Sequence, residues 1–236
     1  MKIVVHGRGT MGTIVKNELG ENCFFVNEIS EVPLEEENCV VIDFSHFSKI
    51  ERMLKECKNR KYPVVIATTG YNGDILKNII ETSKEIPVLL SSNTSLGINL
   101  LNEMLKDITP KLEETFDIEI IEKHHNKKID APSGTAKTLL NTIENSLSEK
   151  YNVVYGREGI CKRERAEIGV HAVRGGTVVG EHSILFLGDD EVIEITHKAL
   201  SKRIFAAGAI ECAKYLEKKE KNLYTMEDMF KDKGER

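Results

Sequence analysis

Short apolar runs alternate with longer stretches of helical spacing over the first 95 residues of the chain. The apolar runs are rich in Val, Ile and Phe and predict strands at 2–5, 23–26, 39–44, 63–66 and 88–90. The stretches between them predict helices at 13–19, 48–58 and 74–85. Strands that alternate with helices in this way indicate a parallel, doubly wound α/β sheet of the Rossmann type, which binds ligands at the carboxyl ends of its strands.

The pattern changes after residue 100 and predicts a second, α+β domain. Two helices are expected at 100–112 and 133–148, and between them Ile118 and Ile120 alternate with acids as in a half-buried strand at 116–121. Further strands, separated by hairpin signals, are expected at 153–155, 167–174, 177–186 and 191–196. We therefore expect a mixed or antiparallel sheet with helices on one face, followed by a C-terminal helix that begins near residue 203.

A glycine-rich loop follows the first predicted strand directly and precedes the first predicted helix. It has the pattern Gly-x-Gly-x-x-Gly, and its candidate cofactor-binding residues are Gly7, Gly9, Thr10, Met11 and Gly12. Glycines at this spacing form the turn, let backbone N–H groups approach a pyrophosphate and let the helix pack on the strand. A plain turn is the alternative interpretation.

The acid expected to bind a ribose lies about 20 residues beyond such a loop. Here the second strand is followed by Asn27 and Glu28, and Glu28 is the candidate, with Asn27 as an alternative register.

The densest collection of reactive side chains lies between Glu122 and Thr135, which reads Glu-Lys-His-His-Asn-Lys-Lys-Ile-Asp-Ala-Pro-Ser-Gly-Thr. It follows a predicted strand and ends where Ser133 is a candidate N-cap of the next helix. Unpaired N–H groups at Ser133, Gly134 and Thr135 would favour an anionic ligand there. Histidine is the side chain that most readily donates a proton near neutral pH.

Three other interpretations of this stretch stay open on the residues alone. Pro-Ser-Gly-Thr is also typical of a capped turn, and paired lysines are typical of a solvated loop. A metal site is disfavoured, because the neighbours His124 and His125 point to opposite faces of an extended chain and no Cys-x-x-Cys or His-x-x-x-His accompanies them.

The composition is that of an ordinary globular protein. The net charge of −5 gives no electrostatic reason to expect nucleic acid or an anionic membrane as a partner. No apolar run approaches the ~20 residues of a membrane span, and no leader pattern precedes the first strand. The five cysteines are odd in number and scattered, as in a reducing compartment, so we expect a cytoplasmic protein.

The segment from His124 to Ala136 resembles the signature of the dihydrodipicolinate reductase family, whose members act in bacterial lysine and diaminopimelate synthesis. The resemblance implies that His124 donates a proton and that Lys128 acts in substrate binding and catalysis. It also implies that His125, Ser133, Gly134 and Thr135 bind the substrate, with His125 and Asp130 positioning His124.

The resemblance extends over the whole chain and implies further parts of the site. Gly70 ends a turn similar to the one on the nicotinamide side in the family, and Ser92 and Asn93 belong to a segment similar to one that lines the site. It implies a dinucleotide-binding domain at 1–97 and 206–236, a substrate-binding and oligomerisation domain at 98–205, and a homotetramer.

We therefore expect NAD(P)H-dependent reduction of the cyclic dicarboxylate 4-hydroxy-tetrahydrodipicolinate to tetrahydrodipicolinate. NADH is favoured over NADPH, because Ile29 follows Glu28 where the family often has an arginine for the extra phosphate. The rival hypotheses are another two-domain dehydrogenase that acts on an amino-acid semialdehyde or imine, and a protein that binds NAD(H) as a sensor.

Overall fold

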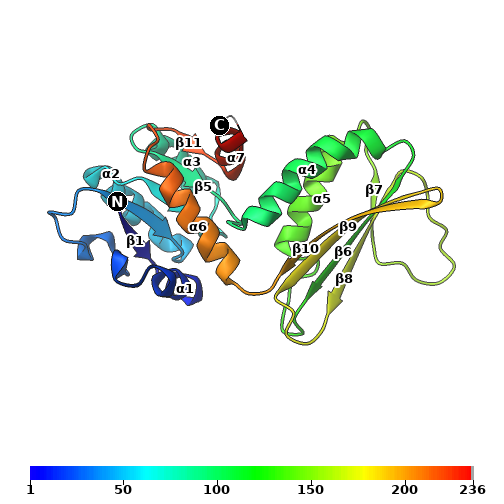
Figure 1. Cartoon of the computed structure of the whole chain (residues 1–236), viewed down its shortest axis with the longest axis horizontal. Helices are drawn as coiled ribbons and strands as arrows, with labels where there is room; N and C mark the ends of the chain where they lie inside the picture. The colour runs from blue at the N-terminus through cyan, green and yellow to red at the C-terminus, as the bar shows by residue number, and fades with distance from the viewer. Residues whose placement is uncertain (235–236) are drawn as a thin grey trace. The chain divides into compact units, whose positions relative to one another are not determined.

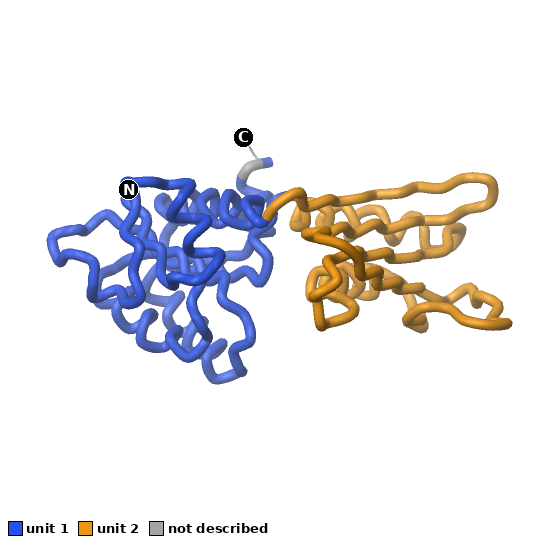
Figure 2. Tube along the Cα trace, turned by 90° about the horizontal axis from the view of Figure 1, so that it is seen from below, with its two compact units in different colours: residues 1–96, 202–236 blue, residues 97–201 orange. Residues whose placement is uncertain are grey.

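The computed structural model describes residues 1–234, so the last two residues of the predicted first domain lie outside the described residues. The chain divides into two compact units (Figure 2), and each unit has its own sheet. Unit 1 comprises residues 1–96 together with the segment from residue 202 onward, and unit 2 comprises residues 97–201.

Unit 1 is built on a six-stranded sheet in which every pair of neighbours is parallel (Figure 1). In spatial order the strands are β11 (Leu223–Tyr224), β5 (Val88–Leu90), β4 (Val64–Ile66), β3 (Cys39–Asp43), β1 (Lys2–His6) and β2 (Cys23–Val26). The strand order reverses at β1, which lies between β2 and β3. The predicted Rossmann-type sheet is confirmed, and β1/β3 is its topological switch point, where such sheets bind ligands.

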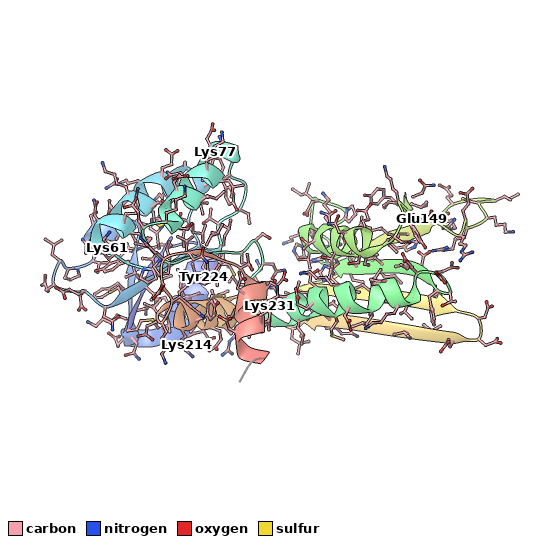
Figure 3. All side chains as sticks on the ribbon, turned by 90° about the horizontal axis from the view of Figure 1, so that it is seen from above. Lys61, Lys77, Glu149, Lys214, Tyr224 and Lys231 are labelled. Carbon is pink, nitrogen blue, oxygen red and sulfur yellow. The ribbon has the colours of Figure 1, made fainter. Side chains whose placement is uncertain are left out.

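Helices cover both faces of this sheet, which is why its central strands are continuous apolar runs. One face packs against α2 (Ile50–Arg60) and α3 (Gly73–Ser83). The other face packs against α1 (Thr10–Leu19), α6 (Arg203–Leu216) and α7 (Met226–Gly234). Lys77 of α3 projects away from the sheet into solvent (Figure 3). Short 3₁₀ turns lie at Gly20–Asn22, Ile29–Glu31 and Phe47–Lys49.

Unit 2 is a five-stranded mixed sheet with two helices on one face (Figure 1). In spatial order the strands are β10 (Glu191–Ala199), β9 (Gly180–Gly188), β6 (Asp117–His124), β8 (Glu167–Arg174) and β7 (Asn152–Tyr155). β6 pairs antiparallel with β9 and parallel with β8. The helices α4 (Leu96–Leu112) and α5 (Gly134–Ser146) form the core with the sheet. The predicted mixed sheet with helices on one face is confirmed.

Rows of side chains run across the helix-covered face of the second sheet. The last apolar row contains Ile195, Ile184, Ile120 and Val170 from β10, β9, β6 and β8. The next row contains His197, His182, Glu122 and Ala172. One step further, His124 lies opposite Arg174. The face therefore changes from apolar to ionisable within two residues of the core.

Several elements differ from their predicted bounds. The first helix begins at Thr10 and not at 13, because the turn needs only Gly7 to Gly9. β6 runs to His124 and not to 121. Its polar residues Glu122 and His124 continue the alternation of the strand, and they are buried because they contact each other. The helix expected from residue 100 begins at Leu96. The tail adds a sixth strand, β11, to the first sheet.

No helix in residues 1–234 combines the length and the apolar character that crossing a bilayer requires.

Candidate active site

His124 is the last residue of β6, and its side chain lies on the helix-covered face of the second sheet, 9% exposed. Its Nδ1 is 2.6 Å from Oε2 of Glu122, two residues earlier on the same face. A Cβ added to Gly180 would lie 3.1 Å from Nε2 of His124, so glycine at that position leaves space beside this nitrogen. The ring is therefore held through Nδ1, and Nε2 is the atom available for proton transfer.

The carboxylate of Glu122 is fully buried and accepts hydrogen bonds from three directions. Arg174 donates to both oxygens, Nη1 to Oε2 at 2.8 Å and Nη2 to Oε1 at 2.7 Å. The backbone N–H of Ser133 donates to Oε1 at 3.0 Å, and His124 donates from Nδ1. Burial alone would raise the pKa of Glu122, but these bonds outweigh it and hold the pKa below its ordinary value. Glu122 is therefore ionised and fixes the orientation of His124.

A second histidine, His182, lies beside His124 with the two ring centroids 5.2 Å apart in an edge-to-face arrangement. Its Nε2 is 3.0 Å from Oγ of Ser133, and its side chain is buried. Burial, with a smaller contribution from the charge of His124, lowers the pKa of His182 to about 4. His182 is therefore neutral near pH 7.

Helix α5 begins directly beside these groups. Ser133 is its N-cap, and the Ser133 hydroxyl accepts from the N–H of Ala136 at 3.1 Å. Nothing lies within 4 Å of the position that a Cβ on Gly134 would occupy, and the first turn holds no acid. The expectation that the Ser133 N–H has no partner within the protein is wrong, because that group donates to Oε1 of Glu122. The positive end of the helix is presented at Gly134 and Thr135.

Lys128 lies in the loop between β6 and α5, with its Nζ 2.7 Å from Oδ1 of Asp130. That hydrogen bond lowers the pKa of Asp130. The predicted role of His125 and Asp130 in positioning His124 is wrong. Glu122 takes that place because residues two apart on a strand share a face, whereas His125 is the next residue along the chain.

Sequence reasoning passed over Glu122, left Arg174 without a definite role and did not single out the contact of His182 with Ser133. The period-two relation of Glu122 to His124 was the available signal. Arg174 is 52 residues from Glu122 along the chain, and His182 is 49 from Ser133, so only the strand register brings them together.

The glycine-rich loop of unit 1 suits a dinucleotide. Gly7 has φ +103°, and a Cβ there would meet the carbonyl oxygen of Phe44 at 2.7 Å. A Cβ on Gly12 would meet the carbonyl oxygen of Gly7 at 1.9 Å, so this glycine lets α1 pack against the loop. At Gly9, the N-cap of α1, nothing lies within 4 Å of a Cβ position. The open side of the loop therefore faces the N–H groups of Thr10 and Met11.

The other predicted cofactor residues also follow strands of the first sheet. Glu28 comes two residues after β2, and its carboxylate lies 3.7 Å from Nζ of Lys49 and 3.4 Å from Nε of Arg52. Gly70, with φ +83°, follows β4, while Ser92 and Asn93 follow β5. Since all strands are parallel, these residues lie at the same edge of the sheet as the glycine-rich loop.

Within the described residues, no group of three or more His, Cys, Asp or Glu side chains is arranged to hold a metal ion.

Two family models match consecutive parts of the chain. The model described as dihydrodipicolinate reductase, N-terminus, matches residues 14–94, and the model described as dihydrodipicolinate reductase, C-terminus, matches residues 97–230.

Curated relatives carry the name 4-hydroxy-tetrahydrodipicolinate reductase. The protein from Brachyspira hyodysenteriae is 47% identical over 97% of this chain and 99% of its own length. The one from Clostridium novyi is 52% identical over 83% of this chain and 77% of its own length.

Among solved structures, a dipicolinate-bound dihydrodipicolinate reductase from Paenisporosarcina sp. TG-14 has the same fold. Its TM-score is 0.74 at 20% identity, over 95% of this chain and 97% of that chain.

The lowered pKa of His182 predicts a pH dependence of stability. The pKa of this histidine is near 6.5 in the unfolded chain and about 4 in the folded chain. Above pH 6.5 it is neutral in both states, so it does not lower the free energy of unfolding there. The free energy of unfolding should then fall by about 3 kcal/mol from this group as the pH drops from 6.5 to 4. Urea unfolding at several pH values measures it.

His182→Gln, which cannot titrate, should reduce the slope over this pH range by that amount. His125→Gln serves as the control for the loss of a histidine and should keep the wild-type slope. Equal slopes in wild type and His182→Gln would show that His182 is not held neutral by the fold.

Proposed function

The chain belongs to the dihydrodipicolinate reductase family, and on this premise we propose how its residues carry out the reaction. It is an NAD(P)H-dependent oxidoreductase that reduces 4-hydroxy-tetrahydrodipicolinate to tetrahydrodipicolinate in lysine and diaminopimelate synthesis. The observation that carries the residue roles is a histidine held by a buried, ionised glutamate next to the start of a helix.

His124 donates the proton. Loss of the C4 hydroxyl as water gives the unsaturated ring. Hydride addition at C4 of that ring then places negative charge at C3, and a proton must arrive there for the reaction to finish. Glu122 holds the ring of His124 through Nδ1, which leaves Nε2 as the nitrogen directed to proton transfer. Arg174 and the Ser133 N–H keep that carboxylate ionised and immobile. Glu122 and Arg174 act as positioning residues.

The two carboxylates of the substrate require positive groups. The N–H groups at the start of α5, at Gly134 and Thr135, provide one binding position. Lys128 provides the other, by exchanging its contact with Asp130 for a substrate carboxylate. The dipicolinate-bound dihydrodipicolinate reductase from Paenisporosarcina supports a dicarboxylate as the ligand.

Unit 1 holds the cofactor, which when bound supplies the hydride. The glycine-rich loop and the first turn of α1, from Gly7 to Gly12, bind the pyrophosphate, and Glu28 binds the adenosine ribose. Gly70, Ser92 and Asn93 form the remaining wall at the strand ends. NADH is favoured, because the carboxylate of Glu28 suits a ribose hydroxyl and repels a 2′-phosphate.

The helix-free face of the second sheet supports assembly into a homotetramer. Its apolar side chains are Val173 and Val192, which are exposed, and Ile121, Leu185 and Leu187, which are half-buried. Apolar side chains gathered on one sheet face are typical of a surface that another chain covers. We place the enzyme in the cytoplasm, in keeping with its five free cysteines.

The proposed catalytic roles predict that His124→Ala and Lys128→Ala each lower kcat by about 100-fold or more, the usual size of a lost proton donor or anchoring charge. The Kd for NADH should stay unchanged, because the cofactor residues lie in unit 1. Steady-state kinetics and fluorescence titration with NADH measure the two quantities. Lys127→Ala, the exposed neighbour, is the matched control and should turn over like the wild type. Wild-type turnover in His124→Ala or Lys128→Ala would disprove the corresponding role.

The cofactor proposal predicts faster oxidation of NADH than of NADPH, with substrate generated freshly from pyruvate and aspartate semialdehyde by the preceding enzyme. Glu28→Gln should shift the NADPH/NADH ratio of kcat/KM upward by roughly tenfold, about 1.4 kcal/mol, since Lys49 and Arg52 then face the phosphate without a carboxylate between them. Glu51→Gln, on the helix α2 that also carries Arg52, is the control for the loss of one negative charge. A ratio that favours NADPH in the wild type would contradict the preference.

Sedimentation equilibrium tests the assembly and should give the mass of four chains. Val192→Asp places a charge on the helix-free face and should lower that mass, whereas Leu34→Asp, at a highly exposed leucine of unit 1, should not. A monomeric wild type would contradict the proposed tetramer.

A further inference from the structure

His6, the last residue of β1, is a buried histidine that none of the roles above uses. Its side chain is 1% exposed, and it directly precedes Gly7 of the glycine-rich loop. Its Nδ1 is 2.8 Å from Oδ1 of Asp43 at the end of β3, and its Nε2 is 2.9 Å from the carbonyl oxygen of Asn27 just beyond β2. One imidazole therefore bridges the carboxyl ends of three adjacent strands.

The partners of His6 determine where its protons lie. The carbonyl oxygen of Asn27 only accepts, so Nε2 must carry a proton. Oδ1 of Asp43, which contacts Nδ1 of His6, also accepts the backbone N–H of Ser45 at 3.1 Å. His6 and Asp43 therefore form a buried, hydrogen-bonded pair that also holds the backbone of Ser45.

Asp43 depends on this pairing. It is fully buried, and its second oxygen, Oδ2, has no hydrogen-bond partner among the described residues. Breaking a buried ion pair from one side leaves an uncompensated charge, whereas replacing both partners with apolar residues is often tolerated. A variant that replaces one partner and a variant that replaces both therefore distinguish the contribution of this pair to the stability of the fold from its effect on the cofactor site.

The segments that His6 joins are those that surround a bound dinucleotide. Asn27 immediately precedes Glu28, the proposed ribose-binding acid. Asp43 begins the turn through Phe44, whose carbonyl oxygen limits Gly7 to glycine. Backbone hydrogen bonds from Gly7 to Val26 and from Phe44 to His6 already join these strands in pairs. The His6 side chain connects the β2 end to the β3 end from the strand between them, and Lys49 Nζ donates to the same Asn27 carbonyl oxygen at 3.3 Å from beyond β3.

We propose that His6 is a positioning residue of the dinucleotide site, which sets cofactor affinity by fixing the Glu28 segment and the Asp43 turn relative to the glycine-rich loop. Buried beneath the loop, it acts through these neighbours and not by touching the cofactor. The inference rests on the proposed use of NAD(P)H by unit 1.

Fluorescence titration of the full chain with NADH tests this role, together with urea unfolding. His6→Leu should raise the Kd for NADH by about tenfold or more and lower the stability. The double variant His6→Leu/Asp43→Leu should recover stability but keep the weakened affinity. Cys57→Ala, a truncation on the buried face of α2, is the control that loses stability and keeps the wild-type Kd.

Wild-type affinity in His6→Leu would overturn the inference and leave the proposed function intact. Loss of affinity in Cys57→Ala in proportion to its loss of stability would also overturn it. A wild-type chain that bound neither NADH nor NADPH would instead refute the cofactor assignment and this role with it.

Discussion

The buried carboxylate of Glu122 is the constraint on which the second unit's site depends. An ionised group without water costs several kcal/mol unless donors surround it. Its donors are His124 of β6, Arg174 of β8 and Ser133, the N-cap of α5. Satisfying one charge therefore fixes a strand end, the neighbouring strand and a helix start in one place. The imidazole of His124 and the start of α5 are close together because they share this acceptor.

The first unit also holds a buried carboxyl group in place by pairing it with a histidine. Asp43 and His6 lie at the carboxyl ends of parallel strands, directly after residues of the apolar core. In both units the buried charge follows the last apolar residues of a strand, where the chain leaves the sheet. Loops are variable in conformation, but a loop that begins at a buried, hydrogen-bonded side chain has a fixed origin. Function that needs precision can then be carried by loop residues.

The fold was largely predictable because it depends on local patterns. Periods of two and 3.6 residues and a glycine pattern after a strand identified both sheets and the loop at Gly7 to Gly12. The polar pairs were not predictable, because their partners are far apart in sequence. Arg174 reaches Glu122, and His182 reaches Ser133, only through the register of β8 and β9 against β6. The same polarity that marks Glu122 and His124 as functional also concealed that they belong to a strand.

The strand register also explains how two histidines can lie side by side without sharing one role. His124 and His182 have ring centroids only 5.2 Å apart, so a proton on one would repel a proton on the other. Glu122 contacts His124 directly, whereas His182 faces the hydroxyl of Ser133 and is more deeply buried. The environment thus separates the two rings into one held by a carboxylate and one that is a neutral hydrogen-bonding group. The difference arises from one carboxylate, whose position two residues before His124 is set by the pleat of β6.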